Sequence, residues 1–446
     1  MSEPRTLLVI AGEFPPLKTI GRIRTVKFVD QLRQHGWRSI VITLKPSGTE
    51  PNYDPSLMAE IVDGVEVVRV PIRNREDEIA NAVKRLLGRK PAAPSVSAAT
   101  ASGAAVAVAA PVATAPSGGL MDHAHAMTRW VLRSFVDVPD DFRLWADEAL
   151  KVARKLCAER RIDAVYTTLP PFSSMFVGHA LRRETGLPWI ADYRDLWYGD
   201  VLREWVPEWR KKIELRMERR LLREADVIVT VSEPKTAYMQ RLHPQLKARW
   251  ETLTNGYDTE LYGERARTRP FSGDTIEFVY TGRLFKNRRG YAFAEALGRI
   301  HRTDPALAGK VRVRILGGLE PAIRRRYDEI LKEYGIAHLY DFAGDVAYAE
   351  AMDAQVNCDY LLLIVDTGET SDGVIPGKLF EYVSVRRPIF ALCDPGATQQ
   401  IIERVARRQA AAAGEQRVGV GFEQWPPGKR GRPEATHCGA DCPSAG

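Results

Sequence analysis

The chain has 446 residues, too many for one ordinary hydrophobic core, and this length predicts two domains. Hydrophobic residues make up 45% of it and charged residues 27%, a balance typical of soluble globular proteins. The net charge of +7 favours an anionic partner, although diphosphates, acidic lipids and nucleic acid all fit that description. No basic run with interleaved aromatic residues resembles a nucleic-acid-binding module, so we expect no nucleic-acid partner.

The five cysteines are odd in number and scattered, which indicates a reducing compartment without a disulfide framework. They also lack the pairing of metal ligands. We expect no metal and no cofactor. The first residues run directly into the apolar segment 7–10, and no stretch of about 20 strongly apolar residues follows anywhere. We therefore expect a cytoplasmic protein without a signal peptide or transmembrane helix, able to touch the inner face of a membrane peripherally.

Strand and helix patterns alternate along the first part of the chain. Apolar runs predict strands at 7–11, 40–42, 164–166, 189–191 and 227–230. Helix periodicity ends at Gly36 for the first helix and covers 176–185 for another. This alternation favours a parallel sheet with helices on both faces, and we assign residues 1–260 to one Rossmann-like domain.

A second alternating series begins after a loop marked by Gly263, Pro270 and Gly273. Its predicted elements are strands at 276–280, 311–315, 360–365 and 388–392, and helices at 291–302 and from about 378. We therefore predict an α/β fold with a second Rossmann-like domain over residues 261–405.

Two segments depart from this order. Residues 91–120 are rich in alanine and contain no charged residue, and we interpret them as a flexible surface insertion rather than a membrane-inserting segment. Beyond residue 405 both periodicities are lost, although the domain should supply at least one more strand and helix. A disordered tail over 406–446 and a changed coding frame near 405 are both consistent with this, and either leaves the C-terminal domain incomplete.

The first loop suited to anion binding follows the strand that ends at Thr281. It contains Gly282, Arg283, Lys286 and Arg288. Ligands bind to open α/β sheets at the carboxyl ends of their strands, and arginine and lysine can neutralise a diphosphate there. A solvated basic loop is the alternative interpretation.

The second loop, 372–382, follows an apolar strand and opens a helix. Free backbone N–H groups at that helix start would face an anion, and Gly373 and Gly377 would let the main chain approach it closely. Lys378 follows directly, and Glu381 lies one turn further in, where it could accept hydrogen bonds from ribose hydroxyls. The segment matches neither a Walker P-loop nor the G-x-G-x-x-G fingerprint.

Several short motifs follow one another in a specific order over residues 5–404. They are Gly12-Glu13-Phe14-Pro15-Pro16 with Gly21, Ala191-Asp192-Tyr193-Arg194-Asp195-Leu196-Trp197, Ala225-Asp226 through Thr230-Val231-Ser232, Thr254-Asn255-Gly256-Tyr257-Asp258, Tyr280-Thr281-Gly282-Arg283-Leu284 and Pro376-Gly377-Lys378-Leu379-Phe380-Glu381-Tyr382. In this order the chain resembles a family 4-type glycosyltransferase of the GT-B fold. That resemblance implies two Rossmann-like domains facing a central cleft, and transfer of a sugar from a nucleotide-sugar donor to a glycan or lipid-linked acceptor.

The resemblance also implies roles for single residues. Arg283 would contact the donor diphosphate, with Lys286 as its partner and Arg288 as the rival for that place. Glu381 matches the second glutamate of the E-x7-E motif, which holds the nucleotide ribose. The predicted donor site comprises Gly21, Gly282, Arg283, Lys286, Arg288, Gly377, Lys378 and Glu381. The predicted acceptor side comprises Asp192, Arg194 and Asp195, and the predicted catalytic residues are Asp195, Arg283 and Lys286.

One position departs from the family pattern. The first glutamate of E-x7-E would fall at 373, where this chain has glycine, with Glu369 and Asp372 as nearby substitutes. Some family members carry a Pro-x-Lys-x-x-Glu form of this segment, as here. Gly373 and the altered C-terminal end keep open a second interpretation, a non-catalytic nucleotide-sugar-binding relative. A sugar-nucleotide epimerase fits less well, because the Asp192–Asp195 segment resembles the transferases.

The resemblance implies transfer with retained anomeric configuration, in polysaccharide or cell-surface glycan synthesis. Basic side chains and a helix N-terminus would stabilise the departing diphosphate. No Asp-x-Asp sequence occurs, so we expect the reaction to be independent of metal.

A repeat of large apolar residues runs through a basic segment. Its members are Trp205, Trp209, Ile213, Met217 and Leu221. It predicts either a basic amphipathic helix on an anionic membrane or a helix that packs this stripe on the sheet, and we favour the second.

Overall fold

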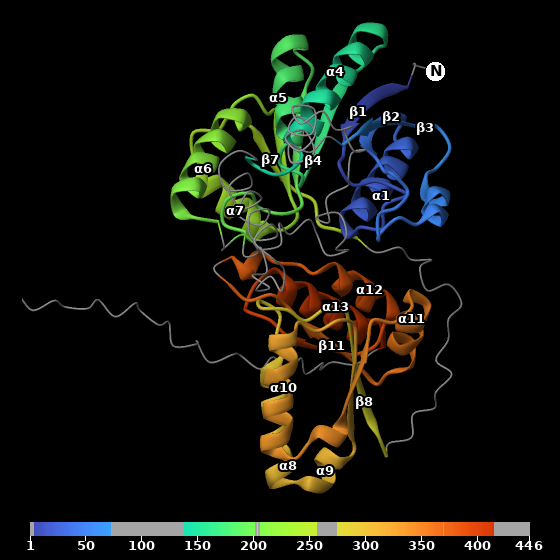
Figure 1. Cartoon of the computed structure of the whole chain (residues 1–446), viewed down its shortest axis with the longest axis vertical. Coiled ribbons are helices and arrows are strands. Elements are labelled where there is room, and N and C mark those ends of the chain that lie inside the picture. Colours follow the sequence, from blue (N-terminus) through green and yellow to red (C-terminus); the bar gives the residue numbers. More distant parts are fainter. Residues whose placement is uncertain are drawn as a thin grey trace, which may run out of the picture.

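The computed structural model describes residues 4–72, 138–200, 203, 206–256, 274–368 and 370–413. Within these ranges the chain forms two α/β units, which occupy the upper and lower halves of the view in Figure 1. The predicted insertion 91–120 and most of the loop between the domains lie outside the described residues. Residues 414–446 of the predicted tail also lie outside them.

The first domain is built on a parallel sheet of order β3-β2-β1-β4-β5-β6-β7. Its strands are β1 (Arg5–Ile10), β2 (Trp37–Lys45), β3 (Val65–Pro71), β4 (Ala164–Leu169), β5 (Trp189–Tyr193), β6 (Val227–Thr230) and β7 (Arg249–Thr252). Its helices are α1 (Ile20–Gln34), α4 (Arg143–Glu159), α5 (Ser174–Thr185), α6 (Glu208–Leu222) and α7 (Glu233–Leu242), with a 3-10 segment at Pro55–Glu60.

The second domain has a parallel sheet of order β10-β9-β8-β11-β12. Its strands are β8 (Ile276–Thr281), β9 (Val311–Leu316), β10 (Tyr340–Gly344), β11 (Tyr360–Ile364) and β12 (Ile389–Leu392). Its helices are α8 (Tyr291–Thr303), α9 (Pro305–Gly309), α10 (Pro321–Tyr334), α11 (Tyr348–Asn357), α12 (Gly377–Val385) and α13 (Ala397–Ala413), with 3-10 segments η5 (Ala337–Leu339) and η6 (Ser371–Gly373). Helix α13 continues through residue 405, where the periodicity of the sequence ends.

Both sheets follow from runs of apolar residues that are covered on two faces. Strand β4 is buried along its whole length, as expected for a central parallel strand between two helical layers. In each domain separate groups of buried residues pack against the two faces of the sheet, so each domain has its own core. These observations confirm the predicted α/β class with two Rossmann-like domains.

Both sheets reverse their order of winding at one point. In the first sheet this point is at β1, which lies between β2 and β4. In the second sheet it is at β8, which lies between β9 and β11. The loops that leave the carboxyl ends there form the usual ligand crevice of an open α/β sheet. The predicted residues near Gly21 and Gly282 follow β1 and β8, so they lie at these two positions.

The two domains contact each other through these carboxyl-end loops. Ser232, just before α7, donates through Oγ to the Gly373 carbonyl at 2.7 Å. Thr370 donates through Oγ1 to the Gly199 carbonyl at the same distance, 2.7 Å. A Cβ at Gly377 would lie 3.5 Å from Ile20, so the start of α12 faces the start of α1.

Helix α6 corrects our interpretation of the apolar repeat. Trp209 and Ile213 are 44% and 46% exposed, whereas the charged residues Arg210, Glu214 and Glu218 are buried. Glu214 accepts hydrogen bonds from Arg210 and from Trp197, which explains why the charged side faces inward. The expectation that the whole stripe packs on the sheet is therefore wrong for Trp209 and Ile213, and Trp205 lies outside the described residues. No helix among the described residues has the length and apolar character needed to cross a membrane.

Candidate active site

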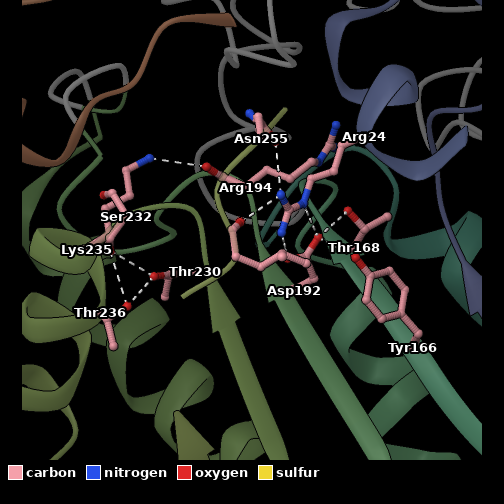
Figure 2. Close-up of polar contacts among 11 residues, drawn as sticks. Arg24, Tyr166, Thr168, Asp192, Arg194, Thr230, Ser232, Lys235, Thr236 and Asn255 are labelled. Carbon is pink, nitrogen blue, oxygen red and sulfur yellow. Dashed lines mark hydrogen bonds and ion pairs between the residues drawn. The ribbon is translucent and has the colours of Figure 1, made fainter. Parts of the chain in front are cut away.

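Asp192, near the end of β5, is fully buried at the carboxyl edge of the first sheet. Arg24 of α1 donates to both of its oxygens, from Nε at 2.8 Å and from Nη2 at 2.7 Å. The Tyr166 hydroxyl donates to Oδ2 at 2.6 Å, and Figure 2 shows these side chains meeting at the carboxylate. Burial and the Asp192 charge raise the pKa of Tyr166 well above its ordinary value, so this hydroxyl keeps its proton. Asp192 thus anchors other groups from inside the domain.

Arg24 also joins α1 to the chain that leaves β7. Its Nη1 donates to the Leu253 carbonyl at 2.9 Å and to Asn255 Oδ1 at 3.0 Å. Burial lowers the pKa of Arg24 and the Asp192 carboxylate raises it, with a net rise, so the guanidinium stays charged. The same side chain therefore connects the end of β5 to the chain that follows β7.

Arg194, the second predicted acceptor-side residue, is 9% exposed. Its Nη1 donates to Glu13 Oε2 at 2.7 Å, and its Nη2 donates to the Pro170 carbonyl. Gly21 lies against this ion pair, since a Cβ there would fall 1.3 Å from Arg194 Nη1 and 1.6 Å from Glu13 Oε2. Glycine at 21 is thus required by the packing of the first domain itself, whatever it does for a ligand.

Asp195 is the most open of the three predicted acceptor-side residues, with its side chain 33% exposed. Lys235 of α7 lies 3.8 Å away, measured from Nζ to Oδ1. The same Nζ donates to the Arg194 carbonyl at 3.2 Å. Asp195 is therefore partly exposed beside one cation, and its catalytic role stays a prediction.

The second domain places Gly282 at the end of β8 with φ of 122°, in the region that favours glycine. A Cβ at Gly317 would lie 2.3 Å from the Gly282 carbonyl, so the loops after β8 and β9 touch. Arg283 and Lys286 follow and are exposed. The Lys286 backbone N–H donates to Glu320 at 3.2 Å. These two cations therefore lie at the rim of the carboxyl edge.

Arg288 and Lys378 lie further in. Arg288 Nη2 donates to Asp366 Oδ2 at 2.6 Å, and Asp366 is 5% exposed. Lys378 Nζ donates to the Tyr280 hydroxyl at 2.8 Å and lies 4.0 Å from the centre of that ring. A Cβ at Gly282 would lie 2.5 Å from Lys378 Nζ, so the glycine and the ammonium are direct neighbours. Arg288 also hydrogen-bonds with Tyr280, so two cations from separate segments approach this hydroxyl.

The surroundings of Lys378 disfavour its charge. Burial and the Arg288 guanidinium lower its pKa well below the ordinary value near 10.5, while Asp366 and Glu381 oppose this. Burial raises the pKa of Glu381, against the opposing effects of its hydrogen bonds with Gln355 and Tyr348 and of the Lys378 charge. An anion placed beside Lys378 would raise the pKa of this ammonium back towards its ordinary value.

The structure thus gathers most of the predicted donor residues around the ends of β8 and β11. Lys378 lies beside Gly282 and is close to Arg288 and Glu381, and Gly377 begins the helix that carries Lys378. Gly21 lies on the facing domain, next to Ile20 at the start of α1. Sequence reasoning missed Arg24, Glu13 as a site residue, Lys235 and Asp366. Of these four residues, only Glu13 could have been identified from the sequence, because it lies in the Gly12–Pro16 motif. No group of three potential metal-ligating side chains occurs in the part of the chain that the structure describes.

Comparison with known proteins agrees with this geometry. The family model described as a glycosyl transferase 4-like domain matches residues 22–256. The chain belongs to this glycosyltransferase family. Its resemblance to family 4-type enzymes of the GT-B fold is confirmed. No curated protein matches the sequence significantly.

Solved structures share the fold at low sequence identity. Sucrose-phosphate synthase from Thermosynechococcus elongatus has 16% identity and a TM-score of 0.52, with 92% of this chain and 90% of that chain covered. A glycosyltransferase from Rickettsia africae has 12% identity and a TM-score of 0.51, with 90% and 82% covered. A trehalose-6-phosphate protein from E. coli, bound with UDP-2-fluoro glucose, has 12% identity and a TM-score of 0.53, with 89% and 86% covered.

The buried position of Asp192 predicts a role in stability. Asp192→Ala leaves the Arg24 guanidinium buried without its carboxylate, and we expect the free energy of unfolding to fall by about 3–5 kcal/mol. Urea unfolding measures this change. Glu184→Ala removes an exposed partner of Arg154 and is the control, with little expected change. Equal stability of the Asp192 and Glu184 variants would contradict the assignment.

Proposed function

We propose that this glycosyltransferase moves a sugar from a nucleotide-sugar donor to a glycan or lipid-linked acceptor, with retained configuration. One observation carries the proposal: Lys378, in the first turn of α12, lies beside Gly282, and Arg288 approaches the same Tyr280 hydroxyl that Lys378 contacts, at the carboxyl ends of β8 and β11. This is the place where doubly wound sheets bind nucleotides, and its charges suit a diphosphate. We place the reaction in polysaccharide or cell-surface glycan synthesis.

The residues of both domains fit distinct parts of that reaction. Lys378 and Arg288 would stabilise the charge that gathers on the departing diphosphate, with Arg283 and Lys286 contributing from the rim. Glu381 would hold the ribose, one turn into α12. Asp195 would act from the first domain, where its carboxylate remains partly open. The E. coli relative bound with UDP-2-fluoro glucose supports a nucleotide-sugar donor.

Lys378→Met should weaken nucleotide diphosphate binding about tenfold or more, because it removes a charge-assisted contact from a partly buried site. UDP, GDP and ADP are screened by thermal shift, and the affinity of each hit is measured by calorimetry. Because the pKa of free Lys378 is lowered and an anion restores it, binding takes up a proton. Affinity should therefore fall as pH rises from that lowered pKa towards the ordinary value, and Lys378→Met should remove this dependence.

Lys332→Met is the matched control for this experiment, since Lys332 is exposed on α10. Its affinity and pH dependence should equal those of the wild type. The same donors are then tested for hydrolysis as nucleotide sugars. Binding without turnover would favour the alternative function, a non-catalytic nucleotide-sugar-binding relative. Binding of no nucleotide, or wild-type affinity in Lys378→Met, would contradict the proposed donor site.

We propose that the transfer needs no metal, because Arg288 and Lys378 are placed to neutralise the diphosphate directly. Turnover in EDTA should match turnover in untreated buffer, measured by release of the nucleotide diphosphate. The control adds excess magnesium after EDTA and should give the same rate. Complete loss of activity in EDTA that magnesium restores would show the proposal to be wrong.

We also propose that α6 makes peripheral contact with an anionic membrane. Its exposed side combines two large apolar side chains with basic ones, namely Trp209, Lys212, Ile213, Arg216 and Arg220. A basic helix with aromatic and aliphatic residues on the same exposed side suits the interface of an anionic bilayer. Such contact would bring a lipid-linked acceptor to the enzyme on the cytoplasmic face.

The double variant Trp209→Ser with Ile213→Ser tests this contact. Wild-type protein should sediment with vesicles that contain phosphatidylserine and stay in solution with vesicles of phosphatidylcholine alone. The double variant should lose most of this binding, because both apolar anchors are gone. Leu307→Ser in the second domain, 46% exposed, is the control and should bind as the wild type does. Sedimentation that is equal for all three proteins would rule out α6 as the contact.

A further inference from the structure

Lys235 of α7 lies where the two domains meet. Its side chain is 9% exposed, and its Nζ donates to the Arg194 carbonyl at 3.2 Å and lies 3.8 Å from Asp195 Oδ1. Figure 2 shows the side chain extending from α7 towards Arg194. One cation therefore holds the turn that follows β5 and presents Asp195.

Gly373 of the second domain lies directly against the aliphatic part of Lys235. A Cβ at 373 would fall 2.8 Å from Lys235 Cγ, closer than real Cβ contacts occur, and 3.4 Å from both the Lys235 nitrogen and Ser232 Oγ. The hydrogen bond from Ser232 Oγ to the Gly373 carbonyl, 2.7 Å long, keeps the two backbones at this separation. Any side chain at 373 would displace Lys235 or separate the domains.

Segment η6, which ends at Gly373, is fixed within its own domain. Ser371 Oγ donates to Asp394 Oδ2, and Thr398 of α13 donates to the Val374 carbonyl at 2.7 Å. Helix α12, with Lys378 in its first turn, begins at Gly377 shortly after this segment. A shift of η6 and the start of α12 would therefore reach Lys235, and through it the turn at Asp195.

We propose that Lys235 is a positioning residue that couples the donor-side loop of the second domain to Asp195 of the first. The contact with Gly373 sets the place of the lysine stem, and the ammonium holds the turn formed by Arg194 and Asp195. The inference rests on the proposed function, because Asp195 affects turnover only if the first domain presents the acceptor or the attacking water. It makes glycine at 373 a requirement of the domain contact.

The first test separates the charge of Lys235 from its bulk. Lys235→Met keeps the stem and removes the ammonium, so hydrolysis of UDP-, GDP- or ADP-glucose, whichever the wild type turns over, should slow about tenfold or more. The affinity for the matching nucleotide diphosphate should stay within about twofold. Lys235→Arg should recover part of the rate, and Lys247→Met, an exposed lysine, should change nothing. Wild-type turnover in Lys235→Met would overturn the proposal.

The second test concerns the steric contact. Gly373→Ala should lower turnover in the wild-type background. In a Lys235→Ala background, where the stem no longer occupies the space, the factor by which Gly373→Ala lowers turnover should be at least threefold smaller. Gly309→Ala is the matched control, because a Cβ at 309 meets nothing within 4 Å. An equal cost of Gly373→Ala in both backgrounds would show that the two residues act independently, which contradicts the coupling.

A third measurement needs no ligand and therefore separates failure of this inference from failure of the proposed function. Hydrogen exchange of backbone amides at 194–196 and 371–374 should rise in both Lys235→Met and Gly373→Ala, and should be unchanged in the two control variants. If no nucleotide sugar is bound or turned over, the proposed function fails and hydrogen exchange alone decides the coupling. Unchanged exchange at 194–196 in Gly373→Ala would overturn it.

Discussion

The bidentate ion pair between Arg24 and Asp192 is the interaction on which the rest of the first domain's functional edge depends. It connects α1 to the end of β5, and the remaining Arg24 donor reaches the chain beyond β7. Removing two charges from water is costly, so such a pair contributes little net stability unless its geometry is good and its oxygens are satisfied. Here Tyr166 supplies a further hydrogen bond to the carboxylate. The pair thus fixes the relative positions of three segments that lead towards the second domain.

The two domains handle charge differently at their facing edges. In the first domain the cations are matched by carboxylates, with Arg24 on Asp192, Arg194 on Glu13 and Lys235 near Asp195. In the second domain Arg288 is matched by Asp366, while burial and Arg288 lower the pKa of neighbouring Lys378. An anion therefore gains most at the second domain, and the first domain presents a carboxylate to whatever lies between them. This division of charge fits a diphosphate on one side and a neutral hydroxyl acceptor on the other.

The parts of the fold that the sequence predicts are those with strong local signals. Strand β11 is an apolar run, and β8 and β9 carry apolar residues at most of their positions, so each was predicted within about one residue. Strand β3 was missed because it lies at the edge of the sheet and most of its side chains are only partly buried. Helix α10 was missed because charged residues dominate its composition and only its buried side is apolar.

Less of the candidate site than of the fold could be predicted from the sequence. Glycines after strands and the basic loop could be located from their spacing, but their partners could not. Arg288 donates to Asp366, which is far along the chain, and this contact could not be read from the spacing of Lys286 and Arg288. Lys235 and Arg24 belong to no local motif, and their importance depends on contacts with Asp195 and Asp192 that only the folded chain creates.

Gly373 shows how a departure from a family pattern changes its meaning in three dimensions. In the sequence, glycine stands at the position where the family pattern has a glutamate, and this supports the non-catalytic alternative. In the structure the space beside its α-carbon is filled by Lys235, so a larger residue would disturb the contact between the domains. The second support for the alternative, the altered C-terminal end, weakens too: α13 continues to residue 413, and its Thr398 holds the Val374 carbonyl behind the donor loop. Thr398, which holds the proposed donor loop at Val374, therefore precedes the point where the sequence loses its periodicity.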